Sequence, residues 1–203
     1  MSHPTIRSIA GATAPSSIDA AHTALLVIDF QNEYFSGKLP IPDGAAAMAN
    51  ARRLVAFADE HKMPVFHIQH VSPAGAPVFA EDSDTVHFHA ELQPAPHHTV
   101  LCKSSVSSFP TTDLDARLKA AKVTTLIVSG LMTHACVAGA ARDAVPLGYA
   151  VIVAADACAS RDIDGTDGKL VPHDMLHRAA LVSVADTFGA VLNTGSIIEL
   201  AQA

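Results

Sequence analysis

Charged and aromatic residues are scarce in this sequence of 203 residues: 16% are charged, 5% are aromatic and none is tryptophan. Because 49% of the residues are hydrophobic, this low charge excludes an intrinsically disordered chain. No hydrophobic run approaches the roughly 18 residues of a membrane-spanning helix. Residues 1–20 lack the basic start and continuous apolar stretch of a secretory signal, and we expect a loose arm there. The length predicts a single domain, residues 1–203.

Cysteine and positive charge are also scarce. The three cysteines are an odd number in a chain of this length, which predicts free thiols in a reducing compartment rather than a disulfide framework. The 13 Lys and Arg residues are outnumbered by 20 Asp and Glu residues, and they form no cluster. The resulting net charge of −7 argues against a nucleic acid or an anionic membrane as partner. We therefore expect a cytoplasmic globular domain.

Short apolar runs alternate with stretches of helical spacing along the chain. The expected strands are Thr23–Ile28, Pro64–Ile68, Thr99–Cys102, Thr124–Ser129, Tyr149–Ala154 and Thr187–Leu192. The expected helices are Asp43–His61, Thr111–Ala121, His134–Leu147, Pro172–Val184 and Gly195–Ala201. This alternation predicts an α/β fold of three layers, α/β/α, with a doubly wound and mostly parallel six-stranded sheet. The expected strand order is the Rossmann-like 3-2-1-4-5-6.

The connection over residues 71–98 is rich in Pro, Gly and His and is too long for a plain connector. We expect this insert to cover a site or an oligomer contact.

Three chemically versatile residues follow strands of the predicted sheet. Asp29 directly follows the first strand, Lys103 follows the third, and Cys136 comes seven residues after the fourth. Ligands of open parallel sheets bind beyond the carboxyl ends of the strands, where these residues should converge. Each has a simpler explanation alone, since most cysteines are inert and strand-end Asp and Lys often cap turns or face solvent. Their coincidence favours a site, in which a helix N-terminus and the ammonium would favour the Cys136 thiolate.

The segments around these residues, LLVIDFQNEYF, CKSSVSSF and VSGLMTHACVAGAARDAVPLGY, resemble the isochorismatase-like cysteine hydrolase family. The resemblance covers about residues 22–195 and includes the later segment DACASRD. It implies that Asp29, Lys103 and Cys136 form a catalytic triad that needs no cofactor. It also implies a non-proline cis peptide at Leu131–Met132 and an oxyanion hole formed by the backbone N–H groups of Met132 and Cys136.

The resemblance further implies acyl transfer from a small-molecule substrate through a thioester on Cys136, with Asp29 as the base and Lys103 stabilising the charged pair. Family members that cleave the enol ether of isochorismate do so without a cysteine nucleophile. The thiol therefore favours hydrolysis of a C–N bond in a small amide, carbamoyl or ureido compound. A homo-oligomer, a dimer or tetramer, is also expected.

Several of the ten aromatic residues lie close to the expected catalytic residues. We expect a small, partly apolar pocket for the substrate. The expected substrate-binding residues are Phe30, Gln31, Tyr34, Phe35, Phe109 and His134. The alternative is that these side chains simply pack beneath the insert.

Two other functions remain open. A metal-dependent hydrolase would use His67 and His70, or His173 and His177, which are spaced as in a zincin helix. We expect no metal there, because the first pair lacks the Asp-x-His pattern of nicotinamidase-like relatives, and the second has Asp where the zincin motif has Glu. The histidines of the insert also lack supporting Cys or Asp spacing. The third possibility is a non-catalytic binding or assembly module on the same fold.

Overall fold

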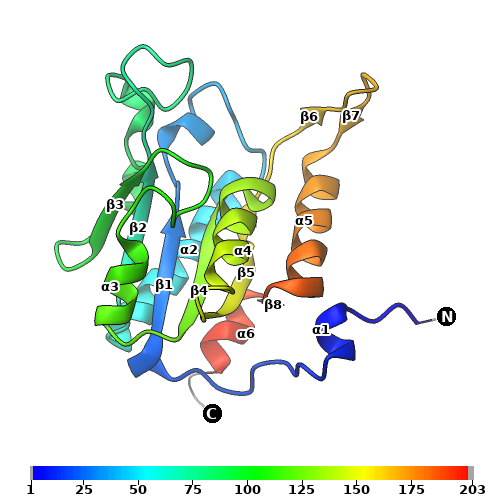
Figure 1. Cartoon of the computed structure of the whole chain (residues 1–203). Coiled ribbons are helices and arrows are strands. Elements are labelled where there is room, and N and C mark those ends of the chain that lie inside the picture. Colours follow the sequence, from blue (N-terminus) through cyan, green and yellow to red (C-terminus); the bar gives the residue numbers. More distant parts are fainter. Residues whose placement is uncertain (1, 201–203) are drawn as a thin grey trace.

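A computed structural model describes residues 2–200 and arranges them as a six-stranded sheet between two layers of helices (Figure 1). The sheet strands are β1 (Thr23–Ile28), β2 (Val65–His70), β3 (Thr99–Lys103), β4 (Thr125–Leu131), β5 (Ala150–Ala159) and β8 (Ala190–Leu192). All are parallel, in the order β3-β2-β1-β4-β5-β8. The predicted three-layer fold and strand order are confirmed, with β8 as the sixth strand of the sheet.

Both faces of the sheet are covered, which explains why its central strand is a continuous apolar run. Side chains alternate along a strand, so Leu25 and Val27 join one core cluster and Leu26 and Ile28 the other. The first cluster lies beneath α2 (Gly44–Glu60) and α6 (Thr194–Glu199). The second lies beneath α3 (Leu114–Ala120), α4 (Ala138–Ala144) and α5 (His173–Thr187).

Strand β5 runs five residues beyond its expected end at Ala154. The additional residues include Asp156, whose carboxylate is satisfied inside the fold. Asp156 Oδ1 accepts hydrogen bonds from the backbone N–H and the hydroxyl of Thr194, at 2.7 and 2.8 Å. The longer strand brings the residues after Ala159 to the edge of the sheet where β1 and β4 end.

Two short elements were not expected from the sequence. Strands β6 (Ile163–Asp164) and β7 (Leu170–Val171) form a hairpin that projects above α5 (Figure 1). The N-terminal arm contains a short helix, α1 (Ile6–Ile9), and the Ile6 N–H donates to Asp186 Oδ1 of α5 at 2.8 Å. The expected end of the last helix at Ala201 lies outside the described residues.

The insert, residues 71–98, contains two 3₁₀ turns, η3 (Asp84–Val86) and η4 (Ala90–Leu92), and packs on the segment that follows β1. The Gln31 side chain anchors the insert to the end of β2. Its Nε2 donates to the backbone oxygens of Val86 and His70, at 2.6 and 2.8 Å, and its Oε1 accepts the His70 N–H at 2.8 Å. The insert thus covers the chain just beyond Asp29.

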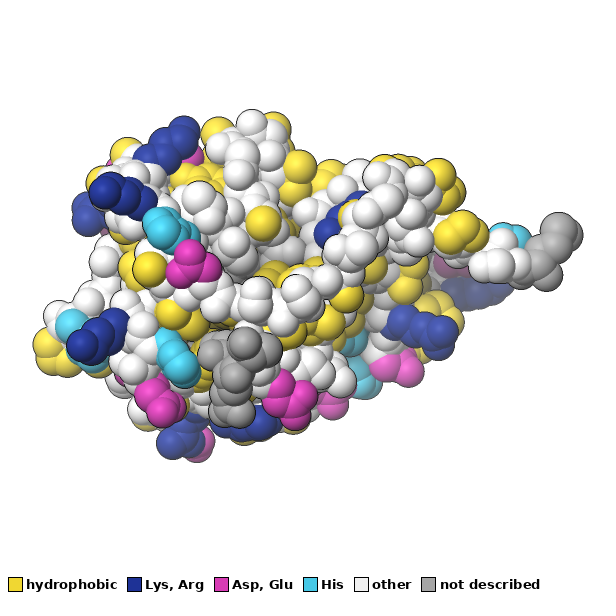
Figure 2. Space-filling model, turned by 90° about the horizontal axis from the view of Figure 1, so that it is seen from below, with side chains coloured by type: hydrophobic (Ala, Val, Ile, Leu, Met, Phe, Trp, Pro, Cys, Tyr) yellow, Lys and Arg dark blue, Asp and Glu magenta, His cyan; other side chains and the backbone are white. Residues whose placement is uncertain are grey.

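Within residues 2–200, no helix combines the length and the apolarity needed to cross a membrane. Figure 2 views the molecule from the amino ends of the strands. On this face, Lys and Arg side chains are distributed around the rim with acidic side chains between them.

Candidate active site

The structure brings Asp29, Lys103 and Cys136 into contact. Lys103 Nζ lies 2.8 Å from Asp29 Oδ2 and 3.4 Å from Cys136 Sγ. Asp29 and Lys103 are at most 1% exposed and Cys136 is 6% exposed. A carboxylate, an ammonium and a sulfhydryl from three distant stretches of chain therefore share one buried site.

The topology explains how Lys103 reaches Asp29. Strand β2 lies between β1 and β3, and Lys103 is paired in register with His70 at the end of β2. The lysine side chain extends past His70, and its Nζ donates to His70 Nδ1 at 3.0 Å and to the Ser105 backbone oxygen at 3.1 Å. An ammonium group only donates, so His70 Nδ1 is the acceptor. Burial, and then the charge of Lys103, lower the pKa of His70 and keep it neutral.

Asp29 adopts a left-handed backbone conformation, with φ of 55°, directly after β1. Aspartate tolerates this region better than most residues. The backbone turns sharply there, while the Asp29 N–H still donates to the Ile68 oxygen at 2.9 Å. Close by, Gly130 of β4 has φ of 156°, and a Cβ atom on it would lie 2.6 Å from the Ile28 Cβ. Glycine at this position therefore lets β1 and β4 approach each other beside the site.

Cys136 lies in a wide π-helical turn, Thr133–Val137, between β4 and α4. The sequence predicted one continuous helix from His134, but the structure divides it into this turn and the shorter α4. Such turns are frequent at functional sites. A cis peptide bond joins Leu131 to Met132 at the start of the turn.

The surroundings of Cys136 favour the neutral thiol, whereas the sequence led us to expect a thiolate. Burial raises its pKa well above the ordinary value, and the charge of Asp29 raises it further. Lys103 acts in the opposite direction without compensating. Burial also raises the pKa of Asp29, while Lys103 favours its ionised form. Asp29 and Cys136 each shift the pKa of the other, so the carboxylate lies in the immediate neighbourhood of the thiol.

Three of the residues expected to bind substrate are buried in the interior. Phe30, Gln31 and Tyr34 are at most 2% exposed. Phe30 and Tyr34 belong to the core cluster beneath α2. The Gln31 amide is bonded to backbone groups of β2 and the insert, as described above. The structure thus assigns these three side chains to packing and to anchoring the insert.

The other expected substrate contacts are dispersed. Phe35 packs on His89, with ring centroids 4.4 Å apart, and Phe109 is buried in the core beneath α3 and α4. His134 is half-buried in the same turn as Cys136, and its Nδ1 lies 3.0 Å from the Ser160 Oγ.

The histidine pairs considered as metal ligands do not converge. His67 and His70 project from opposite faces of β2. His67 Nε2 lies 3.2 Å from His98 Nδ1, whereas His70 contacts Lys103.

The second pair has separate partners as well. His173 Nδ1 lies 2.8 Å from Asp162 Oδ1, and His177 Nδ1 lies 2.7 Å from Thr133 Oγ1. The zincin-like spacing of these two histidines therefore serves two different contacts.

Within residues 2–200, one group of three potential metal ligands is clustered: Asp59, His97 and His98, whose ligand atoms lie within 4.8 Å of one another. Both imidazole Nε2 atoms lie 2.9 Å from Asp59 Oδ1. The Ala95 N–H donates to His98 Nδ1 at 3.0 Å, which places the proton of a neutral His98 on Nε2, facing the carboxylate. That nitrogen is therefore a donor to Asp59 and offers no lone pair to a metal.

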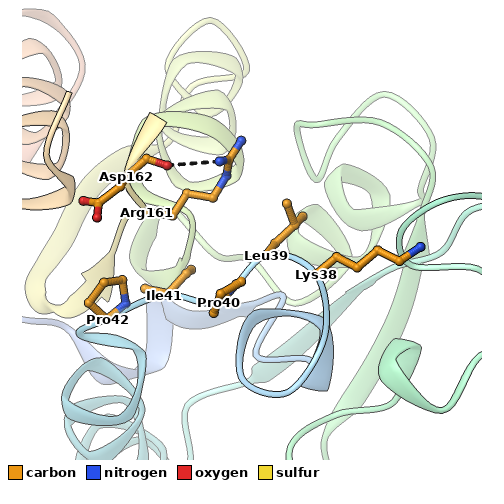
Figure 3. A pocket seen from close by; sticks show the side chains of 7 residues that line it. All are labelled: Lys38, Leu39, Pro40, Ile41, Pro42, Arg161 and Asp162. Carbon is orange, nitrogen blue, oxygen red and sulfur yellow. Dashed lines mark hydrogen bonds between the residues drawn. The ribbon is translucent and has the colours of Figure 1, made fainter. Parts of the chain in front are cut away.

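A cleft of about 360 Å³ opens between the segment before α2 and the segment after β5 (Figure 3). It is lined by Lys38, Leu39, Pro40, Ile41, Pro42, Arg161 and Asp162. Sequence analysis missed Arg161, because β5 was expected to end at Ala154. With the strand end at Ala159, the rule that selected Asp29 and Lys103 would have selected Arg161 as well.

Comparison with known proteins agrees with this geometry. The model of the isochorismatase domain matches residues 23–196. An isochorismatase family protein of Bacillus subtilis, YddQ, is 35% identical over 87% of this chain and 99% of its own length. The crystal structure of an isochorismatase from Pseudomonas putida superposes with a TM-score of 0.90, at 30% identity, over 97% of this chain and 100% of that one.

Other similar proteins carry names that state a reaction. Streptothricin hydrolase of Streptomyces noursei is 36% identical over 80% of this chain and 59% of its own. The ureidoacrylate amidohydrolase RutB of Methylobacterium radiotolerans is 29% identical over 87% and 78%. A cysteine hydrolase from Pseudomonas syringae has a TM-score of 0.88 at 26% identity, over 98% of each chain. The domain match covers most of the sequence, and the solved isochorismatase structure has the same architecture. This chain therefore belongs to the isochorismatase family of hydrolases.

Proposed function

We propose that this protein hydrolyses the C–N bond of a small amide, carbamoyl or ureido compound, with Cys136 as the nucleophile. The observation that carries the proposal is the contact of Lys103 Nζ with both Asp29 Oδ2 and Cys136 Sγ. The names of the related streptothricin hydrolase and ureidoacrylate amidohydrolase support hydrolysis of this bond type. The name of the structurally similar cysteine hydrolase supports the nucleophile.

In the first half of the reaction, Asp29 accepts the thiol proton as Cys136 Sγ attacks the substrate carbonyl carbon. The new C–S bond forms while the carbonyl π electrons move to oxygen, giving a tetrahedral oxyanion. We assign the stabilisation of this oxyanion to the backbone N–H groups of Met132 and Cys136. As the oxyanion collapses, the C–N bond breaks, and Asp29 returns its proton to the departing nitrogen. The products are an amine or ammonia and a thioester on Cys136.

In the second half, Asp29 takes a proton from water, and the hydroxide attacks the thioester carbonyl. Collapse of this intermediate breaks the C–S bond and releases the acid, while the proton on Asp29 returns to the sulfur. One carboxylate thus serves both halves as base and then as acid. The Lys103 ammonium balances whichever neighbouring atom holds the negative charge.

The Cys136→Ala variant tests this function. It should lose all measurable ammonia release from a panel of small amides and ureides, while its circular dichroism and thermal midpoint stay close to the wild type, because the 6%-exposed thiol is replaced by a small apolar group. The matched control is Cys102→Ala, which removes an exposed thiol and should leave turnover unchanged. Hydrolysis that persists in the Cys136→Ala variant at the wild-type rate would refute the proposed nucleophile.

A further inference from the structure

The Lys103 ammonium has more acceptors around it than protons to donate. Among residues 2–200, its Nζ lies 2.8 Å from Asp29 Oδ2, 3.0 Å from His70 Nδ1, 3.1 Å from the Ser105 backbone oxygen and 3.4 Å from Cys136 Sγ. An ammonium carries three N–H groups, so two of these four acceptors share one of them. The four acceptors differ in charge, and this difference indicates which two share.

Two of the acceptors, His70 Nδ1 and the Ser105 oxygen, are neutral. The other two, Asp29 and Cys136, exchange a proton in the proposed reaction, so the negative charge is on one of them at a time. If each neutral acceptor takes one N–H group of Lys103, the third N–H lies between the carboxylate and the sulfur. This third N–H can then follow the negative charge from oxygen to sulfur while the ammonium stays in place.

The surrounding structure holds His70 firmly. The Gln31 side chain bonds both the N–H and the oxygen of the His70 backbone, at 2.8 Å each. The His70 ring packs on Phe79 of the insert, with ring centroids 5.1 Å apart. Phe79 has a left-handed backbone, with φ of 54°, which is rare for a bulky residue, and its N–H donates to Glu33 Oε2 at 3.4 Å. Such a conformation persists only where its neighbours hold it, so the insert keeps the His70 ring against the lysine.

His70 must be neutral to accept this hydrogen bond. With Nδ1 as the acceptor, the one ring proton is on Nε2, and a second proton would turn Nδ1 into a donor that faces the ammonium. Burial lowers the pKa of His70, the charge of Lys103 from β3 lowers it further, and the charge of Asp29 at the end of β1 raises it by less. The insert adds only the uncharged Phe79 ring. The neutral form of His70 therefore persists below pH 6.5.

We infer that His70 is a positioning residue of the active site, whose neutral Nδ1 holds the Lys103 ammonium so that one N–H group remains for Asp29 and Cys136 to share. This inference rests on the proposed function and adds a means of regulation to the same site. Ser105 supplies the other neutral acceptor through its backbone, so the arrangement depends on His70 as a side chain. Protonation of His70 removes the acceptor and places a second positive charge beside Lys103, which should switch the enzyme off in acid.

Alkylation of Cys136 by iodoacetamide tests the inference without knowledge of the substrate. Sulfur displaces iodide from this small amide, and peptide mass spectrometry measures the rate at Cys136, with the exposed Cys102 as an internal reference. His70→Asn provides an amide oxygen as the acceptor and does not titrate. His70→Leu fills a similar volume without an acceptor. The matched control, His87→Asn, removes an exposed histidine of the insert.

At neutral pH, His70→Leu should slow the alkylation of Cys136 by about tenfold or more, the effect of losing one hydrogen bond to a charged group. His70→Asn should restore the rate to within about threefold of the wild type, because its oxygen accepts the same N–H group. The rate at Cys102 should be the same in all four proteins. In ¹H–¹⁵N correlation spectra, the His70 ring, assigned by its absence from His70→Asn, should carry its proton on Nε2.

The pH dependence separates positioning from packing. The wild type should lose reactivity at Cys136 as the pH falls through the titration midpoint of His70, which the same spectra report, whereas His70→Asn has no group that titrates there. The rate of His70→Asn relative to the wild type should therefore rise by about tenfold at one pH unit below that midpoint. The rate of His87→Asn relative to the wild type should stay constant.

A His70→Leu variant that reacts as fast as the wild type would overturn the inference, and so would a Cys136 that iodoacetamide does not modify. The same holds for a neutral His70 with its proton on Nδ1, or for a His70→Asn rate in constant ratio to the wild type at every pH at which the protein is folded. Failure of the proposed function has a different signature, namely amide hydrolysis that survives in Cys136→Ala. The tautomer and the titration of His70 are measured without any hydrolysis.

Discussion

His67 is a fully buried ionisable side chain in β2, and its environment predicts a specific loss of stability in acid. Its Nε2 lies 3.2 Å from His98 Nδ1, and its Nδ1 has no hydrogen-bond partner among residues 2–200. Burial, and then the charge of His98, lower the pKa of His67 from 6.5 to about 4. His67 therefore binds a proton more weakly in the folded protein than in the unfolded chain.

The direction and size of the effect follow from linkage. Between pH 6.5 and about 4 the unfolded state binds more protons at this position than the folded state, so the free energy of unfolding falls as the pH falls. The stabilisation is present in full above pH 6.5 and is lost progressively down to about pH 4. A pKa difference of about 2.5 corresponds to about 3 kcal/mol. That is a substantial part of the stability of a typical domain.

Urea denaturation at about pH 7 and about pH 4 would compare the wild type with His67→Phe, whose ring can still stack on His98 and meet Phe88 edge to face. Phenylalanine does not titrate, so the wild type should lose about 3 kcal/mol more than the variant between these two conditions. The control, His87→Gln, removes an exposed histidine of the insert and should follow the wild type. Equal losses in the wild type and His67→Phe would refute the reasoning.

Two further substitutions probe the buried polar groups of the site. Lys103→Met should lower the free energy of unfolding, measured by urea denaturation, by about 3–5 kcal/mol, because it leaves the Asp29 carboxylate buried and unpaired. The double variant with Asp29→Asn should recover much of this loss. A single variant as stable as the wild type would contradict the prediction. Gln31→Ala should cost about 3 kcal/mol and expose residues 71–98 to proteolysis, because it removes two hydrogen bonds to the His70 backbone and leaves the Val86 oxygen with only Gln69 as donor; an unchanged digestion pattern would show that Gln31 does not anchor the insert.

The fold was predictable from the sequence wherever a local pattern determines the structure. Strand β1 was predicted with its observed bounds, because all six of its residues are buried and both of its neighbours are strands. Strand β5 was predicted too short, and the residues beyond its expected end include Asp156. Its hydrogen-bond partner, Thr194, is 38 residues away in sequence, and no local pattern reveals that contact.

The candidate site was predictable in part for the same reason. The strand order places Asp29 and Lys103 at one edge of the sheet. The contact between them also requires the lysine side chain to extend past His70, and this depends on the strand register and on the lysine rotamer. Aromatic residues near a strand end can turn toward either the core or a cleft, and sequence does not distinguish the two. Phe30 and Tyr34 turned inward, and the cleft wall is formed instead by the Pro40–Pro42 segment.

The position of Lys103 also bears on how a protonated thiol can act as a nucleophile. The ammonium contacts the carboxylate oxygen at 2.8 Å and the sulfur at 3.4 Å at the same time. In the reaction that we propose, the proton moves from Cys136 to Asp29 and the negative charge moves from oxygen to sulfur, yet both atoms remain next to the same cation. The net charge of the buried site stays constant, so the transfer avoids the desolvation cost of creating a new isolated charge. In the proposed mechanism Lys103 therefore stabilises the resting ion pair and the reactive thiolate alike, so a raised thiol pKa is compatible with that mechanism.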